Sequence, residues 1–375
     1  IYNMKLSYWE YKQWLNAIDF AIVGSGIVGL CTALFLKKRF PNKKVIIIEK
    51  GIFPQGASTK NAGFACFGSI SEILNDLNSH DNSEILELVQ ERANGLGLLR
   101  KTIGDSNIGF NLHGGYELFL KKDNALYEKC LDKMDHINSL LFSVFKDDIY
   151  HDIPNKFRFS NIQKRLIYNK FEGQIDTGLL ITNLLRKVTA LGVKILNNIT
   201  VKSYQQLNAS VDVLTDNFEF NTKNLFLTTN AFTNSLKSID LKPARSQVLI
   251  TQPIQNLKIK GTFHLDSGYY YFRNIDNRIL LGGGRNLDFN GEETLEFGIT
   301  QQIQNELEKL LSEVILPNYE FEIDKRWSGI MGVGSQKKPI ITQYSENVFM
   351  GARMGGMGIA IGCSVGQRLS KLVNK

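Results

Sequence analysis

Hydrophobic residues follow a regular order near the start of the chain. Residues 19–23 are apolar after the first position, which predicts a short buried strand. A glycine-rich turn follows at once, and the apolar segment that continues to about Phe40 has the spacing of a helix. A second apolar run at 45–48 predicts another buried strand, which ends at Glu49. Strand, turn, helix and strand within about 30 residues are typical of a βαβ unit with parallel strands.

The rest of the pattern predicts an α/β chain, α+β overall. Apolar positions at helical spacing predict helices at 83–103, 123–145, 179–191, 294–311 and 359–372. Apolar and β-branched runs predict strands at 115–120, 193–195, 225–229, 247–251, 269–273 and 279–281. We expect the last three of these strands to build one sheet. Residues 1–16 precede the first strand and are expected to form a packing helix without chemistry of its own.

The turn after the first strand has the glycine spacing of a dinucleotide site. Gly24 permits a tight turn, Gly26 lets the backbone approach a pyrophosphate, and Gly29 lets the helix pack on the strand. The helix begins near Ile27 and Val28, where free N–H groups and a partial positive charge favour phosphate. A glycine turn inside a core without a nucleotide is the alternative.

The acid after the second strand favours the nucleotide. Glu49 lies about 20 residues beyond Gly29, where a carboxylate accepts hydrogen bonds from the adenosine ribose, and Lys50 follows it. A carboxylate at this position disfavours a 2′-phosphate. We therefore expect no NADP.

Composition narrows the class of the protein. The 375 residues suffice for two domains, and 43% hydrophobic with 22% charged residues are typical of a soluble globular protein. The formal charge of +7 comes from short, scattered groups of basic residues. The simplest interpretation is that these groups lie on solvated faces of the protein. Steering of an anionic substrate is the next interpretation, and nucleic-acid binding is not expected. The four cysteines and five histidines show no disulfide or metal spacing, which favours a reducing compartment without a metal site.

The apolar stretch at 20–36 is too short for a membrane helix, which needs about 20 residues. A signal peptide is not expected either, because Asp19 precedes the stretch and basic residues follow it at 37–39. The sequence therefore predicts a cytoplasmic protein without a transmembrane segment.

A run of small and polar residues follows the second strand at 56–64. By itself it fits either a surface loop or a backbone that approaches a flat ring system. It resembles the Ser-x-x-Asn-Ala-Gly signature of the D-amino-acid oxidase superfamily of flavoproteins, which includes glycine oxidase, sarcosine oxidase and the D-amino-acid dehydrogenases. Later segments resemble further motifs of that superfamily in the same order, at 173–178, 198–201, 327–330, 339–340 and 351–358.

The resemblance implies FAD as the cofactor and a discontinuous fold. It implies a Rossmann-like FAD-binding domain at 17–78, 161–240 and 325–375, and a substrate-binding domain on a mostly antiparallel sheet at 79–160 and 241–324. Residues 1–16 then form an N-terminal extension. It also places these residues at FAD: Ser58, Thr59, Lys60, Asn61, Ala62, Gly63, Val201, Gly329, Arg353, Gly355, Gly356, Met357, Gly358 and Ile359.

The last helix suggests a role without the resemblance. Its N-terminus, after the glycine-rich turn at 351–358, would stabilise negative charge near flavin N1. A helix that only closes the sheet is the alternative.

The implied activity is oxidation of an amine or amino acid at its C–N bond. Hydride passes from the carbon beside a neutral amine to flavin N5, and water hydrolyses the imine. The electron acceptor would be O2 or a respiratory or quinone acceptor. No cysteine lies between 327 and 339, so FAD is expected to be non-covalent, with Cys66 as the residue to check. Leu280 stands near the place of the oxygen-activating lysine of related oxidases, which favours a dehydrogenase.

Substrate candidates come from the predicted strand at 269–273. Tyr269, Tyr271 and Arg273 share one face by strand alternation and would offer two phenols and a cation to an anionic ligand. Aromatic packing within the sheet is the alternative.

One departure from the superfamily bears on the substrate. Related amino-acid oxidases carry a carboxylate-binding arginine where this chain has Met331. Either Arg273, Arg285 or Arg353 holds the carboxylate, or the substrate has no α-carboxylate. A larger amine or an N-substituted amino acid then also fits.

Three other functions stay open. A flavin enzyme for 2-hydroxy acids or other alcohols would need a general base, for which His113 and His264 are candidates. A non-catalytic flavoprotein is the second, and a nicotinamide dehydrogenase is the third. The exact substrate, its stereochemistry and the oligomeric state are not predicted by the sequence.

Overall fold

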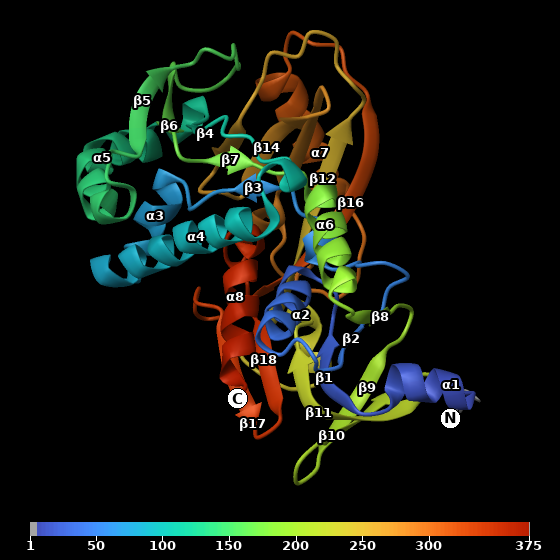
Figure 1. The fold of residues 1–375 in the computed structure, drawn as a ribbon. Coiled ribbons are helices and arrows are strands. Elements are labelled where there is room, and N and C mark those ends of the chain that lie inside the picture. The colour runs from blue at the N-terminus through green and yellow to red at the C-terminus, as the bar shows by residue number, and fades with distance from the viewer. Residues whose placement is uncertain (1–5, 375) are drawn as a thin grey trace.

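The apolar runs of the βαβ unit form the centre of a largely parallel sheet. The computed structural model describes residues 6–374, and Figure 1 shows this sheet in its lower half. Its strands are β1 (Ile18–Val23), β2 (Val45–Ile48), β8 (Lys194–Leu196), β9 (Val201–Gln206), β10 (Val211–Thr215), β11 (Glu219–Leu227), β17 (Ile340–Ser345) and β18 (Val348–Ala352). The order is β17-β18-β11-β1-β2-β8, parallel except for the edge pair β17–β18. The hairpin β9–β10 pairs antiparallel with β11.

Alternate residues of β1 face two different cores. The helices are α1 (Tyr8–Glu10), α2 (Ile27–Arg39), α3 (Ile70–Asp76), α4 (Asn82–Ile103), α5 (Asn124–Phe145), α6 (Thr177–Ala190), α7 (Gln301–Leu310) and α8 (Gly358–Leu372). Phe20 and Ile22 pack with α2, α6 and α8, whereas Ala21 and Val23 pack with the hairpin β9–β10. Helix α2 is buried over residues 27–36 because α6 and α8 pack against it, and α8 also contacts α4 (Figure 1).

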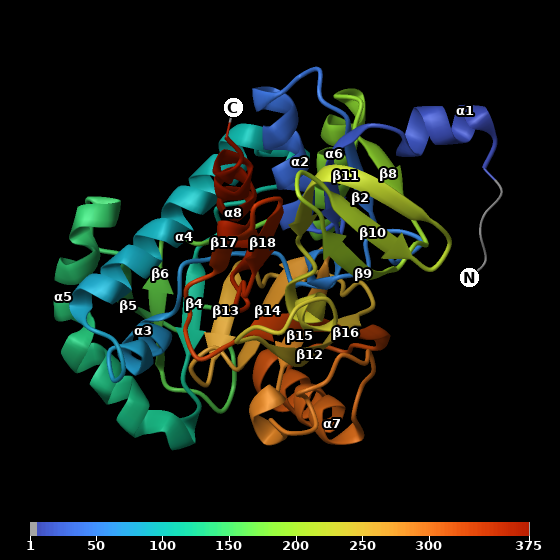
Figure 2. The same ribbon diagram turned by 90° about the horizontal axis from the view of Figure 1, so that it is seen from below.

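The second sheet contains the strands that the sequence predicts to be antiparallel. They are β4 (Gly115–Leu118), β5 (Tyr150–Pro154), β6 (Arg165–Asn169), β12 (Lys242–Thr251), β13 (Thr262–Leu265), β14 (Tyr270–Ile275), β15 (Arg278–Gly283) and β16 (Ile323–Val333). The order is β16-β12-β15-β14-β13-β4-β6-β5, antiparallel except for β13–β4. One face carries Phe263, Phe272 and Leu281 in a core shared with α7, which lies under the sheet in Figure 2. The mixed α/β fold class is confirmed.

Two expected domain limits do not coincide with the sheets. Residues 165–169 (β6) and 323–333 (β16) were expected largely on the FAD side, but both strands belong to the second sheet. Strand alternation identifies a half-buried strand and does not identify its partner, so the local pattern could not assign these two. The division of the chain into two domains stays a prediction.

Three predicted elements have different bounds. The helix expected from 294 begins only at Gln301, and the strand expected at 198–201 begins only at Val201. The N-terminal segment is helical, as α1 and a π-helical turn (Tyr11–Leu15), but it stands apart from the body in Figure 2. Only Leu15 of this segment is buried, and Tyr8, Trp9 and Tyr11 are exposed, so the expected packing is limited to the last residues of the segment.

The first residues of the expected extension, 1–5, lie outside the described part of the chain. Over residues 6–374, no helix combines the length and the apolar character needed to cross a bilayer.

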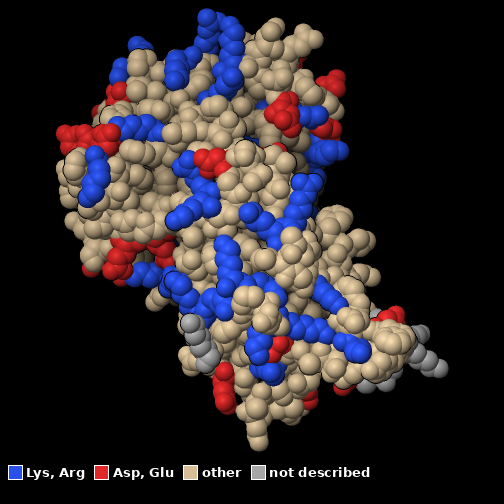
Figure 3. Space-filling model, in the orientation of Figure 1, with Lys and Arg blue, Asp and Glu red and all other residues tan. Residues whose placement is uncertain are grey.

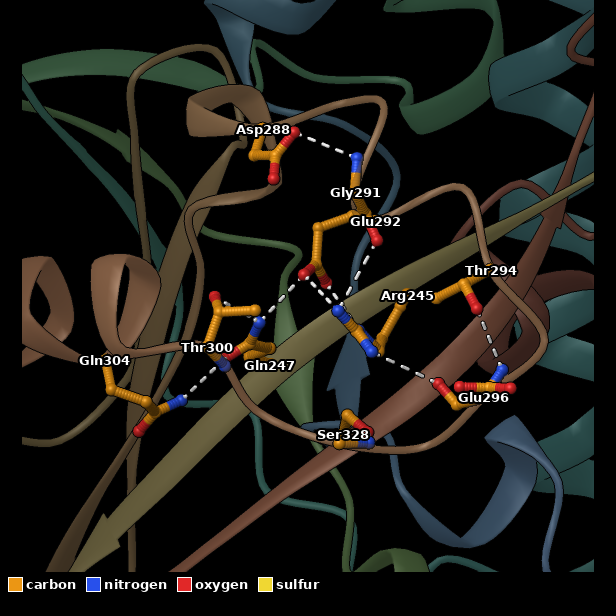
Figure 4. Close-up of polar contacts among 11 residues, drawn as sticks. Arg245, Gln247, Asp288, Gly291, Glu292, Thr294, Glu296, Thr300, Gln304 and Ser328 are labelled. Carbon is orange, nitrogen blue, oxygen red and sulfur yellow. Dashed lines mark hydrogen bonds and ion pairs between the residues drawn. The ribbon is translucent and has the colours of Figure 1, made fainter.

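A buried ion pair explains the late start of α7 (Figure 4). Arg245 on β12 donates from Nε and Nη2 to the carboxylate of Glu292, at 2.9 and 2.7 Å. Gln247 donates to the same carboxylate and accepts from the Thr300 N–H at 2.9 Å. These contacts hold the segment before Gln301 as a loop over the sheet. The Thr300 N–H and the Glu292 carboxylate are hydrogen-bonded to side chains of β12, and so this segment does not form a helical turn.

The glycine turn after β1 depends on the absence of side chains. Gly24 has φ +100°, a conformation that L side chains rarely adopt. A Cβ on Gly29 would stand 2.0 Å from the Gly24 carbonyl oxygen and 2.7 Å from Thr228 Oγ1. The helix can pack this closely on the strand ends only with glycine at position 29.

Gly29→Ala should destabilise the protein by roughly 3 kcal/mol or more, because the clash is with backbone that cannot move freely. Gly97→Ala is the matched control, since Gly97 lies in α4 with no atom within 4 Å of its Cβ position. That control should be neutral or stabilising by up to about 1 kcal/mol. Urea unfolding of both variants checks this, and equal stabilities would contradict it.

Candidate active site

The N-terminus of α2 meets the loop after β2. The Ile27 N–H donates to Ser58 Oγ at 2.9 Å, and a Cβ on Gly26 would come within 2.9 Å of the same oxygen. The short turn Ala57–Thr59 therefore lies directly against the glycine turn. The first amides of a helix lack partners within the helix and carry partial positive charge. This junction can therefore bind phosphate oxygens.

Glu49 is buried at the end of β2, beside the glycine turn. Its Oε2 accepts from the N–H and the Oγ of Ser25, at 2.9 and 2.6 Å, and its Oε1 accepts from the Gly51 N–H at 2.9 Å. No described Lys or Arg forms an ion pair with it, and Lys50 beside it is exposed. Each carboxylate oxygen can accept more than one hydrogen bond, so Glu49 can also receive ribose hydroxyls.

Asn61 organises the small-residue loop that the sequence singles out. Its Nδ2 donates to the carbonyls of Ala57 and Ser58, and its Oδ1 accepts from the Gly63 N–H at 2.8 Å and from Thr177 Oγ1 at 3.0 Å. All four contacts are internal to the fold. Asn61 therefore fixes the loop conformation, which leaves backbone groups to face a cofactor.

The late tryptophan–glycine motif lies against this loop. Trp327 Nε1 donates to the Lys60 carbonyl at 2.9 Å, and a Cβ on Gly329 would stand 3.1 Å from Lys60 Cβ. Residues about 270 positions apart thus lie together where β16 contacts the turn Ala57–Thr59 and the residue after it. Two predicted cofactor residues, Lys60 and Gly329, meet at this point.

The C-terminal glycine loop is exposed and precedes α8. Gly355 and Gly356 have φ +55° and +82°, and the Gly355 N–H donates to the Gly332 carbonyl at 3.1 Å. Met331 Sδ lies 3.5 Å from the Cβ position of Gly356, so the residue in the place of the superfamily's arginine does face this loop. Met357 is half-buried, and Gly358 and buried Ile359 begin the helix.

Arg353 has a structural role. Its Nη1 donates to Asp240 Oδ2 at 2.8 Å and its Nε donates to the Lys338 carbonyl at 3.0 Å. The side chain is thereby turned into the protein, and φ is +62°. Asn230, which the sequence did not single out, accepts from the Arg353 N–H at 3.0 Å. An asparagine directly after a buried strand was its only signal.

One face of the second sheet, here called the roof face, lies opposite the 61–64 loop. Strand pairing aligns Glu117, His264, Tyr271, Gly282, Val248 and Trp327 in one row across six strands. The next row along contains Thr262, Arg273, Leu280 and Ile250. Ala62, Val248 and Leu280 form a small apolar core with Phe64, Tyr271 and Trp327 packed against it.

Two of the three predicted substrate residues share this face. Tyr271 donates or accepts a hydrogen bond with Ser246 at 2.8 Å, and Arg273 lies on the same face. Tyr270 and Phe272 point to the opposite core, as predicted. Tyr269 does not belong with Tyr271, because it precedes the strand and its ring is half-exposed against Phe289.

Arg273 is a buried cation without an acidic partner. It is 2% exposed, and its Nη1 donates to the carbonyls of Gly63 and Ile175, at 3.1 and 2.6 Å. Its Nε is buried with no hydrogen-bond partner among residues 6–374. Burial lowers the pKa of Arg273 to about 10, so it stays charged at neutral pH.

Two carboxylates and a histidine are buried beside Phe64. His264 Nε2 lies 3.0 Å from Glu172 Oε2, and Glu117 accepts from the side chains of Ser69 and Ser71. Burial alone would lower the pKa of His264, but the Glu172 carboxylate outweighs it and raises the pKa to about 9. Burial raises the pKa of Glu117 to about 7, although the hydrogen bonds from Ser71 and the charge of His264 oppose this.

Glu117 and Glu172 were missed from the sequence. Glu117 stands in a predicted strand as the only charge among apolar residues, and Glu172 lies just before the motif at 173–178. A lone acid in a buried strand was therefore the available signal. His113, the other histidine considered as a base, lies outside the roof face, near Lys260.

Parallel strands, a glycine turn on a helix N-terminus and a second sheet opposite it define a dinucleotide-binding flavoprotein fold. The chain belongs to the DAO family, FAD dependent oxidoreductase, whose model matches residues 19–372. The protein is therefore an FAD-dependent oxidoreductase, and the resemblance found in the sequence is confirmed.

Solved structures share the fold at low sequence identity. Glycine oxidase from Geobacillus kaustophilus matches with a TM-score of 0.75 and 18% identity, covering 95% of each chain. Iminodiacetate oxidase from Chelativorans sp. BNC1 matches at 0.74 and 18%, covering 94% of each. L-proline dehydrogenase from P. horikoshii matches at 0.72 and 18%, covering 95% of this chain and 93% of that one. A search of curated protein sequences found no match.

The residues present fit FAD. A Cβ on Gly26 would come within 2.9 Å of Ser58 Oγ at the helix N-terminus, whereas a Cβ on Gly355 would meet no atom within 4 Å. The first position keeps the backbone accessible to a pyrophosphate, and the second leaves room beside α8. Glu49 supplies acceptors without a neutralising cation. FAD is expected to bind through these groups and the loop around Asn61.

The Glu172–His264 pair makes a prediction about pH. Folding raises the pKa of His264 from an ordinary 6.5 to about 9. The protonated His264 therefore adds its full contribution to the free energy of unfolding below pH 6.5, and this contribution is lost as pH rises through 9. The loss should be on the order of 3 kcal/mol. Urea unfolding of the wild type at pH 6.5 and 9 measures it. Glu172→Gln should flatten this dependence, and an unchanged slope in that variant would contradict the pairing.

Proposed function

We propose that the protein oxidises the C–N bond of an amine or amino acid bound between the roof face and FAD. The observation that supports this most lies on the roof face, where buried Arg273 is paired in register with Leu280 and forms no ion pair with any residue from 6 to 374. A face whose one cation without an ion-pair partner among the described residues is Arg273 suits a small zwitterion or carboxylate. Bound FAD supplies the hydride acceptor. The chain then has to hold the reacting carbon, exclude water and keep the amine neutral.

Arg273 is the residue that we propose binds the substrate carboxylate. Met331 has no charge, Arg353 is held by Asp240, and Arg285 stacks on Phe289 away from the roof face. Arg273 keeps Nε without a partner among the described residues. Its charge also disfavours an ammonium nearby, and so favours the neutral amine that can release hydride.

The structure does not favour a 2-hydroxy acid as substrate. Alcohol oxidation uses a general base that is unprotonated at working pH. His264 is the only histidine on the roof face among the described residues, and with its pKa raised to about 9 it is charged at neutral pH. His113 lies outside that face. The amine class therefore has the stronger support.

Non-covalent FAD remains part of the proposal. Cys66 is buried, and burial raises the pKa of its thiol well above the usual range, so little reactive thiolate forms. Leu280 occupies the roof face close to Ala62, where a lysine would bring a charge. A dehydrogenase with a separate electron acceptor is the form that this position favours.

Anaerobic mixing of purified holoenzyme with amines, amino acids, N-alkyl amino acids and hydroxy acids tests the proposal. Amines or amino acids should bleach the visible flavin absorption, because reduced flavin loses that band. Bleaching by hydroxy acids alone would overturn the amine assignment. Flavin that no compound bleaches would point to a non-catalytic flavoprotein.

Arg273→Met should lower the flavin reduction rate by about 100-fold for substrates with a carboxylate, because the charge-assisted contact between the guanidinium and the carboxylate is lost. Amines without a carboxylate should change less than about fivefold, provided FAD content and thermal stability are retained. Arg285→Met, which removes a cation outside the roof face, is the matched control and should leave both rates unchanged. Equal losses for both substrate types in Arg273→Met would assign the residue a structural role only.

A further inference from the structure

Three lysines converge on a surface hollow at one end of the second sheet. The hollow has a volume of about 350 Å³ and is lined by His113, Tyr116, Lys156, Phe157, Lys258 and Lys260. These residues come from three segments far apart in the chain: the approach to β4, the β5–β6 connection and the approach to β13. Figure 3 shows basic side chains gathered at this end of the molecule, above β5 and β6.

The charge of the hollow is uncompensated. Its lining contains no Asp or Glu, and none of the three lysines forms an ion pair with any residue from 6 to 374. Elsewhere, exposed lysines such as Lys170 and Lys242 do pair with acids. Burial, together with the positive charges of Lys260 and Arg273, lowers the pKa of His113. Like charges that converge without counter-ions repel one another, and a bound anion relieves that repulsion.

The floor of the hollow is rigid. Tyr116 stacks on Phe263 with ring centroids 5.1 Å apart, and Phe157 meets Tyr116 edge-on at 4.8 Å. Lys156 Nζ lies 5.2 Å from the centroids of both Tyr116 and Phe157. These contacts restrain a side chain that is otherwise flexible, so part of the entropy lost on binding is already lost in the free protein.

The hollow is separate from the flavin site. Tyr116 and Glu117 are neighbours on β4 and so point to opposite faces of the sheet. Glu117 belongs to the roof face, whereas Tyr116 belongs to the core on the other side. The aromatic floor of the hollow therefore lies on the side of the sheet away from the 61–64 loop.

We propose that this hollow is a second binding site, for a multiply charged oxyanion of metabolite size, either a phosphate ester or a polycarboxylate. Three ammonium groups and an imidazole provide charge and donors for such a ligand. The two aromatic rings provide an apolar surface for its carbon skeleton. A volume of about 350 Å³ is within the range of small-molecule sites.

Calorimetric titration of FAD-saturated holoenzyme with inorganic pyrophosphate and, separately, with citrate tests the proposal. Ionic strength is matched with NaCl, and saturation with FAD keeps pyrophosphate from the cofactor site. We expect saturable binding of at least one probe with the flavin absorption unchanged. Binding of pyrophosphate alone would indicate a phosphate ester, and binding of citrate alone a polycarboxylate. Binding of both would show a site that selects by charge.

Charge reversal locates the binding. Lys258→Glu combined with Lys260→Glu should weaken the bound probe at least tenfold, because two of the three ammonium groups become carboxylates. Lys202→Glu, on exposed β9, changes a lysine far from the hollow in the fold and should leave binding unchanged. No binding by wild type, or equal binding by the double variant, would overturn the proposal. Thermal unfolding of each variant shows whether it has folded.

Discussion

The guanidinium of Arg273 connects the roof sheet to the FAD side of the molecule. It donates to the carbonyls of Gly63 and Ile175, and the Ile175 N–H in turn donates to the Gly63 carbonyl at 2.8 Å. Gly63 has φ +73°, and a Cβ there would come within 2.9 Å of the Arg273 Nη1. A buried cation costs free energy unless dipoles or ligands compensate it. The two carbonyls compensate part of this cost, and Nε stays without a hydrogen-bond partner among residues 6–374.

Strand alternation separates two kinds of chemistry in the same sheet. Along β13, Thr262 and His264 face the site, whereas Phe263 faces a core of stacked aromatic rings. Along β14, Tyr271 and Arg273 face the site, and Phe272 stacks on Phe263 with centroids 4.5 Å apart. The aromatic face buries apolar side chains, which stabilises the sheet and fixes the register of these strands. The polar face can therefore hold buried charges without losing the strand pairing.

Several predictions rest on local chemistry. The positions of Gly24, Gly29 and Glu49 follow from what a tight turn, a close helix and a ribose require, and these requirements hold within one βαβ unit. The loop around Asn61 was recognised by its resemblance to a superfamily signature, and three of the four hydrogen bonds of the Asn61 side chain stay within residues 57–63. Helices α4, α5, α6 and α8 were found because their apolar spacing is long and regular.

The predictions that failed depend on partners distant in the chain. The helix predicted from 294 was wrong, because Glu292 pairs with Arg245 and the helix begins only at Gln301. The role predicted for Arg353 stays a prediction, although Asp240 holds its guanidinium. Glu172 carries no local sign that it will meet His264. The sequence by itself determined the cofactor-binding unit, because its geometry is set by short-range sterics and helix-end amides. Only the tertiary structure decided which charged side chains share the roof face, because strand order and register place side chains that no spacing along the chain relates.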